Sequence, residues 1–153
     1  MHGFLLWFIS LCIIILDQIS KAYISRNLLV GQSLPVLRNI FHITLVHNTG
    51  IAFGLLKGYS IFFVVVSLFI IAFITRELMV GHTRNCLAKG IALSLLLGGA
   101  CGNLLDRLRY GYIVDFLDFR IWPVFNIADS AITIGIMMVA YLVWKKSPRH
   151  QSS

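Results

Sequence analysis

Apolar residues fill four long stretches of this chain, and polar residues are concentrated between them. The stretches cover about residues 4–24, 59–75, 87–105 and 125–144. Each approaches the roughly 20 residues that a helix needs to cross the hydrocarbon core of a bilayer. The pattern therefore predicts four membrane-spanning helices in one integral-membrane domain, residues 1–153.

The two loops on one side of the predicted membrane, residues 25–58 and 106–124, have another character. Residues 41–47 alternate in part between apolar and polar and are rich in β-branched side chains, which indicates a strand. The turn signal Asn48-Thr49-Gly50 follows. The second loop is again extended as far as Pro123, which disfavours helix at the residue before it and begins the last span. We expect an all-α membrane protein with four transmembrane helices and a small extracytoplasmic β-sheet.

The composition agrees with a membrane protein. The chain is 58% hydrophobic and 12% charged, with a mean hydropathy of +0.85, whereas a soluble domain has about 25% charged residues. A net charge of +7 suits contact with anionic lipid head groups. No basic stripe carries the interleaved aromatic residues that base stacking needs, so we expect no nucleic-acid partner.

Four spans place both termini on one side of the membrane. The numbers of Lys and Arg on the two sides do not decide the orientation by themselves. Several basic residues on the far side belong to polar clusters and are interpreted as site residues, so we expect both termini to be cytoplasmic. The first apolar stretch continues past Asp17 to Ile24 without a cleavage site, which predicts a retained span rather than a signal peptide.

Metal and cofactor sites are not predicted. Cys12, Cys86 and Cys101 are odd in number and widely spaced, which supports neither a disulfide framework nor a zinc site. His42 and His47 are five residues apart in the predicted strand and so lie on opposite faces. Neither a zinc-protease H-E-x-x-H motif nor a G-x-S-x-G nucleophile motif occurs.

Polar residues recur on one face of two spans. Asp17 and Lys21 are four residues apart near the outer end of the first span. Asn103, Asp106 and Arg107 occupy positions i, i+3 and i+4 on the third span. Ion pairs that merely lower the cost of charge at the membrane surface explain these groups, and so does support of a site. Both interpretations stay open.

Two further aspartates lie in the last third of the chain. Asn126 and Asp129 are good helix-capping residues at the start of the fourth span, and capping alone explains one of them. Asp115 and Asp118 in an extended segment point to opposite faces, so one can face a site while the other faces water. A bend near Pro123 would let Asp115 and Asp129 meet.

Two carboxylates that meet share one proton, because they cannot both stay ionised a few ångströms apart. One then acts as a general base on water and the other protonates the scissile carbonyl, which is amide hydrolysis without a covalent intermediate. Two other functions are alternatives. A small proton- or cation-coupled transporter would place its charges near the bilayer midplane, whereas here they cluster near one surface. A membrane scaffold would use the same charges only as interfacial ion pairs.

Five ordered motifs extend this picture over the whole chain. The sequence resembles the lipoprotein signal peptidases, or signal peptidases II, of bacterial inner membranes. The motifs are Asp17-Gln18-Ile19-Ser20-Lys21, Asn48-Thr49-Gly50-Ile51-Ala52-Phe53, Gly98-Gly99-Ala100-Cys101-Gly102-Asn103-Leu104-Leu105-Asp106-Arg107, Val114-Asp115-Phe116 and Phe125-Asn126-Ile127-Ala128-Asp129-Ser130.

The resemblance implies a monomeric, cofactor-free aspartyl endopeptidase in the inner membrane, with its active site near the outer face. It implies diacylglyceryl-prolipoprotein substrates, cut just before the lipid-modified cysteine, contact with membrane lipids and inhibition by globomycin-type cyclic peptides. Asp115 and Asp129 correspond to the catalytic pair. The supporting residues correspond to Asp17, Lys21, Asn48, Gly50, Asn103, Asp106, Arg107, Asn126 and Ala128.

Overall fold

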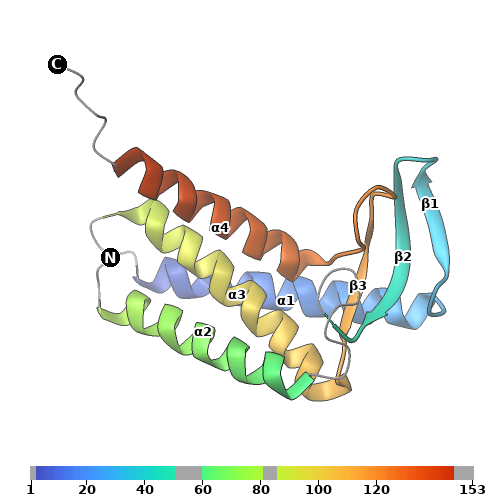
Figure 1. The fold of residues 1–153 in the computed structure, drawn as a ribbon, viewed down its shortest axis with the longest axis horizontal. Helices are drawn as coiled ribbons and strands as arrows, with labels where there is room; N and C mark the ends of the chain where they lie inside the picture. Colours follow the sequence, from blue (N-terminus) through green and yellow to red (C-terminus); the bar gives the residue numbers. More distant parts are fainter. Residues whose placement is uncertain (1–2, 51–59, 81–85, 147–153) are drawn as a thin grey trace.

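The computed structural model describes residues 3–50, 60–80 and 86–146. In these ranges the chain forms a bundle of helices with a small sheet across one end, as Figure 1 shows. The elements are α1 (Gly3–Asn27), β1 (Ser33–Leu37), β2 (Phe41–Asn48), α2 (Ser60–Val80), α3 (Leu87–Tyr110), β3 (Ile113–Asp118) and α4 (Ile127–Lys146).

All four of these helices are long and apolar enough to cross a membrane, which confirms the predicted fold class. Each helix ends later than the apolar stretch that predicted it. α3 has 24 residues, so it is about 36 Å long and exceeds the roughly 30 Å hydrocarbon core. Its last turns therefore carry polar residues beyond the apolar stretch, at the end of the bundle where the sheet lies.

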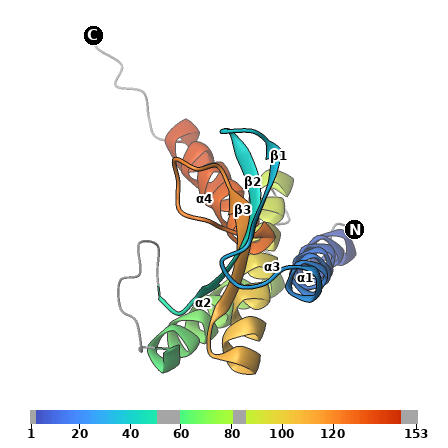
Figure 2. The ribbon, with the colours of Figure 1, turned by 90° about the vertical axis from the view of Figure 1, so that its right-hand side faces the viewer.

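α3 is the central helix and packs against α1, α2 and α4 (Figure 2). Glycines permit this close approach. A Cβ atom at Gly99 would lie 2.5 Å from the carbonyl oxygen of Ala128 in α4, and one at Gly102 would lie 2.6 Å from Oδ2 of Asp17 in α1. Any larger side chain at these positions would push α1 and α4 away from α3.

The three strands form an antiparallel sheet in the order β1-β2-β3. Val46 of β2 pairs with Asp115 of β3, and His42 pairs with Asp118, with a register shift between Ile43 and Val46. The predicted strand at residues 41–47 and the extended second loop are thereby confirmed. The sheet lies beside the end of α1, the end of α3 and the start of α4 (Figure 1).

The fourth helix begins at Ile127, two residues after the predicted start of the span. Phe125 is not helical because it pairs with Leu117 of β3. The Leu117 N–H donates to the Phe125 carbonyl oxygen at 2.7 Å, and the Phe125 N–H donates to the Leu117 carbonyl oxygen at 3.1 Å. This short antiparallel pairing turns the chain back on itself and brings the first turn of α4 beside β3.

Candidate active site

Asn126 and Asp129 cap the start of α4 reciprocally. The Asp129 N–H donates to Oδ1 of Asn126 at 2.8 Å, and the Asn126 N–H donates to Oδ2 of Asp129 at 3.3 Å. This is the arrangement of a capping box, with Asp in place of the usual Glu or Gln. The capping interpretation is therefore correct for both residues, yet both side chains also contact groups outside the helix.

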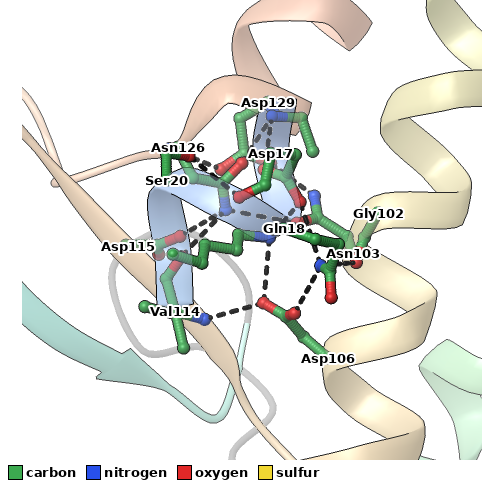
Figure 3. A network of polar contacts seen from close by, with 12 residues as sticks. Asp17, Gln18, Ser20, Gly102, Asn103, Asp106, Val114, Asp115, Asn126 and Asp129 are labelled. Carbon is green, nitrogen blue, oxygen red and sulfur yellow. Dashed lines mark hydrogen bonds and ion pairs between the residues drawn. The ribbon is translucent and has the colours of Figure 1, made fainter. Parts of the chain in front are cut away.

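Asp115 lies on β3 (Figure 3) and is buried, and each of its oxygens accepts from an amide group. Nδ2 of Asn126 donates to Oδ1 at 2.7 Å, and Nδ2 of Asn48 donates to Oδ2 at 2.9 Å. Asn48 is held in turn by Gly50, whose N–H donates to Oδ1 of Asn48 at 3.1 Å. The end of β2 thus supplies one contact of the carboxyl group, and the cap of α4 supplies the other.

Asn103 of α3 joins the two aspartates into one network. Its Nδ2 donates to Oδ1 of Asp129 at 2.8 Å, and its Oδ1 accepts from Nδ2 of Asn126 at 3.1 Å. Asp115 and Asp129 are therefore linked through Asn126, and Asn126 and Asp129 are linked through Asn103. In the described part of the chain, neither aspartate forms an ion pair with Lys or Arg.

Burial raises the pKa of Asp115 from 3.8 to about 7, and the charge of Asp129 contributes in the same direction. The hydrogen bonds from Asn48 and Asn126 and the charge of Lys21 oppose this shift. A carboxyl group with a pKa near 7 can exchange a proton at physiological pH, which is the property that general acid–base chemistry requires.

A second group of charged side chains lies next to Asp115 and Asp129 and contacts the same network through Asn103. Nζ of Lys21 is 2.8 Å from Oδ2 of Asp17, 2.9 Å from Oδ2 of Asp106 and 3.0 Å from Oδ1 of Asn103. The free oxygen of Asp17 accepts the Ala128 N–H at 3.0 Å. All three protons of the Lys21 ammonium are thereby used, so Lys21 ties α1 to α3 and, through Asp17, to the first turn of α4.

Gln18 is a member of this group that the sequence analysis did not select as a site residue. Its Nε2 donates to Oδ1 of Asp106 at 2.9 Å and contacts Oδ2 of Asp17 and the Gly102 carbonyl oxygen at 3.2 Å each. Its Oε1 accepts from Arg109 at 2.9 Å. A polar residue next to Asp17 in an apolar span was the signal that could have identified it.

A cavity of about 900 Å³ opens in front of the aspartates. Arg107 borders it, with its guanidinium 5.1 Å from the centre of the Phe63 ring. The rest of the lining is largely apolar and comes from α2, α3, α4 and residues 122–125. Six of the predicted site residues line this cavity: Asn48, Gly50, Asn103, Arg107, Asp115 and Asp129.

The remaining predicted site residues form the support behind the cavity: Asp17, Lys21, Asp106, Asn126 and Ala128. Residues 51–53 of the second motif lie outside the described residues. In the described ranges no three His, Cys, Asp or Glu side chains are grouped so that they could hold a metal ion.

The prediction that one of Asp115 and Asp118 faces water is wrong, because both are buried. Asp118 accepts from the Thr44 hydroxyl at 2.7 Å, and from the backbone N–H and Nη1 of Arg120 at 2.8 and 3.1 Å. Burial opposes the ionisation of Asp118, but these bonds prevail and its pKa lies below the ordinary value. Asp118 is thus a structural acid of the sheet, away from the cavity.

The fold and the site together define a class: an integral membrane protein with four membrane-spanning helices, whose small sheet and helix ends surround a buried acidic site. The model of the family described as signal peptidase (SPase) II matches residues 9–145. The chain belongs to the signal peptidase II family. It is accordingly a membrane-bound peptidase of the aspartic type, as the resemblance of its five motifs implied.

Individual relatives agree with this assignment. The lipoprotein signal peptidase of Halothermothrix orenii is 39% identical over 142 residues, which are 93% of this chain and 97% of that protein. The lipoprotein signal peptidase of Moorella thermoacetica is 46% identical over 133 residues, 87% of this chain and 88% of that protein. A bacterial membrane enzyme solved by the in meso method at 2.3 Å resolution superposes with a TM-score of 0.88 at 32% identity, covering 95% of this chain and 91% of that one.

Proposed function

We propose that the chain cuts diacylglyceryl-prolipoproteins just before the lipid-modified cysteine, with Asp115 and Asp129 as the catalytic pair. The general activity follows from the family: removal of signal peptides from lipoproteins in the bacterial inner membrane. The observation that carries the finer proposal is the shared amide network of Asn48, Asn103 and Asn126, which holds both carboxyl groups at one cavity without a cation.

The chemistry requires one proton on the pair. The ionised carboxylate takes a proton from a water molecule while the water oxygen bonds to the scissile carbonyl carbon. The protonated carboxyl group donates its proton to the carbonyl oxygen, which gives a neutral tetrahedral intermediate. The C–N bond then breaks as the proton that the base received passes to the leaving amine, and one hydroxyl group of the intermediate returns its proton to the other carboxylate, which restores the singly protonated pair. The new carboxyl terminus belongs to the signal peptide, and the new amino terminus belongs to the lipid-modified cysteine.

The lining of the cavity supports a substrate that arrives through the lipid. Apolar side chains such as Ile70 of α2 and Ile132 of α4 line it below the aspartates, which suits a signal-peptide helix and acyl chains. The charged groups of the lining are confined to the end near the sheet, where water can reach the peptide bond. Because Lys21 is fully engaged with protein oxygens, Arg107 is the cation placed to contact backbone or head-group oxygens. Globomycin-type cyclic peptides would occupy the same cavity.

The orientation of the chain is part of the proposal. The start of α1 and the end of α4 lie at the bundle end away from the sheet (Figure 1). We place that end in the cytoplasm and the aspartates near the outer surface. Cys86 directly precedes α3, so a membrane-impermeant thiol reagent should label it only after the membrane is permeabilised. Labelling of Cys86 from outside intact cells would reverse the orientation.

Cleavage of a lipid-modified prolipoprotein by the purified chain in detergent tests the catalytic pair. Asp115→Asn and Asp129→Asn should each lower the rate by about 10²–10⁴-fold or more, because each removes a group that must transfer a proton. The matched control is Asp118→Asn, which changes a buried aspartate of the same strand outside the cavity and should leave cleavage near the wild-type rate. Cleavage at the wild-type rate by either Asp115→Asn or Asp129→Asn would overturn the proposal.

A further inference from the structure

The orientations of the three asparagines are fixed by groups that can only donate hydrogen bonds. The Gly50 N–H donates to Asn48, the Asp129 N–H donates to Asn126, and the Lys21 ammonium donates to Asn103. Each of these donors requires the amide oxygen of its asparagine. The NH₂ group of each asparagine must therefore point to the other side, which is where a carboxyl group lies.

The two carboxyl groups accept different sets of hydrogen bonds. Asp115 receives a short amide bond on each oxygen, at 2.7 Å from Asn126 and 2.9 Å from Asn48. Asp129 receives one short bond, from Asn103 to Oδ1 at 2.8 Å, whereas the contact of its Oδ2 within the described residues is the 3.3 Å one with the backbone N–H of Asn126. Donors that point at both oxygens favour the ionised form of Asp115. Oδ2 of Asp129 is the oxygen that is free to carry a hydrogen.

The positive end of the α4 dipole does not reverse this preference. An N-terminal position such as that of Asp129 normally favours a negative charge. Here the Ala128 N–H is bonded to Asp17 and the Asp129 N–H is bonded to Asn126. The Asp17 carboxylate, paired with Lys21, already supplies the negative charge at this helix end.

We propose that Asp115 is the ionised general base of the pair and that Asp129 carries the shared proton on Oδ2 and donates it to the scissile carbonyl. The inference rests on the proposed function, and it assigns the roles of general base and proton donor, which the proposed function leaves open. Asn48, Asn103 and Asn126 are then positioning residues, since they set where the proton sits and do not react themselves.

The other charges around the pair are compatible with this assignment. Asp17 and Lys21 of α1 and Asp106 of α3 form their own buried group, and Arg107 of α3 lines the cavity with both aspartates. From β2 the His47 ring stacks on Tyr112 at 4.0 Å, and the described cavity lining from α2 holds no charged residue.

The repulsion between the two aspartates explains why the pair holds one proton. The negative charge of Asp129 is among the causes that raise the pKa of Asp115, so the two groups do not both stay ionised. Repulsion is relieved whichever carboxyl group is protonated, and the amide bonds therefore decide which one carries the proton.

The pH profile of kcat/KM for Asn48→Ala distinguishes the two assignments. If Asp115 is the base, loss of the Asn48 donor raises the pKa of its protonation, so the acid limb moves up by about one pH unit and the basic limb stays in place. If Asp115 were instead the proton donor, the basic limb would move and the acid limb would not. Either that result or two unmoved limbs would overturn the assignment. Asn27→Ala, at an exposed asparagine whose side chain donates to the Tyr23 carbonyl oxygen, is the matched control and should move neither limb.

Carboxyl ¹³C NMR of the aspartate-labelled chain in detergent micelles gives a readout that needs no activity. The chain has five aspartates, and the Asp→Asn variants assign their signals. Between the two limbs, Asp115 should show the shift of an ionised carboxylate and Asp129 that of a protonated one, and the reverse pattern would overturn the assignment even if Asn48→Ala were inactive. Retained cleavage by Asp115→Asn or Asp129→Asn would instead refute the proposed function and leave the NMR result to decide the charge state.

Discussion

Two pairs of aspartates belong to this network, and they are stabilised in different ways. Asp17 and Asp106 share the Lys21 ammonium at 2.8 and 2.9 Å, and all three side chains are at most 4% exposed. Asp115 and Asp129 contact asparagine amides instead and border a cavity. A cation keeps a buried carboxylate ionised, whereas amide donors alone leave it able to take up a proton. The first pair is therefore suited to structure and the second to proton transfer.

The largest expected effect comes from removing the cation of the structural pair. Lys21→Met leaves two buried carboxylates without their partner, and loss of one partner of a buried ion pair costs about 3–5 kcal/mol. Denaturant unfolding in detergent micelles should show this decrease in the free energy of unfolding. Lys89→Met is the matched control, because Lys89 is 38% exposed and lies 3.4 Å from Glu77, an arrangement worth at most about 1 kcal/mol. Equal losses in the two variants would mean that Lys21 is no more important to the fold than a surface lysine.

The pair at the cavity should instead weaken the fold as the pH rises. Asp115 has a pKa of about 7 when folded and an ordinary pKa near 4 when unfolded, so between these values the unfolded chain binds fewer protons than the folded one. The free energy of unfolding therefore falls through this window and levels off above pH 7. From pH 5 to pH 8 the loss should be about 2–3 kcal/mol.

Unfolding of Asp115→Asn over the same pH range isolates this contribution. The variant should show a smaller decrease in the free energy of unfolding than the wild type, because only the contribution of Asp115 is removed. Asp118→Asn should keep the wild-type slope, since the pKa of Asp118 is lowered and lies below this range. A wild-type slope in Asp115→Asn would show that Asp115 does not titrate near neutral pH in the folded chain.

The sequence predicted the spans well because the bilayer requires each of them to be long and apolar. It also singled out these four aspartates, since a charged residue in or beside an apolar stretch is conspicuous, but it did not pair Asp17 with Asp106. Hydropathy ended the third span at residue 105, but the helix continues to Tyr110 and ends where Gly111 adopts a φ of 76°. Asn103, Asp106 and Arg107 thus lie within the helix, three or more residues before its end.

That Asp115 and Asp129 line the same cavity could not be derived from local pattern alone. It depends on the pairing of Phe125 with Leu117, a contact that hydropathy and turn signals do not encode. The error at Asp118 has a similar origin. Alternation along β3 correctly separates Asp118 from Asp115, but it does not reveal that Thr44 on the neighbouring strand covers Asp118. Tertiary contacts therefore decide that Asp115 lines the cavity and that Asp118 bonds to a hydroxyl group.

The smallest expected effect concerns Asp118, a third kind of acid in which a half-exposed cation meets a buried carboxylate. Nη1 of Arg120 is 3.1 Å from Oδ2 of Asp118, with the arginine side chain 50% exposed. Arg120→Gln removes this ion pair but keeps the backbone N–H that donates to Oδ1, so the free energy of unfolding at pH 7 should fall by less than about 1 kcal/mol. Cleavage should be unchanged, because Arg120 does not line the cavity. A decrease in the free energy of unfolding as large as that of Lys21→Met would show that Asp118 depends on its cation as Asp17 and Asp106 do. The exposure of Arg120 would then not distinguish its ion pair from the buried ion pairs of Lys21.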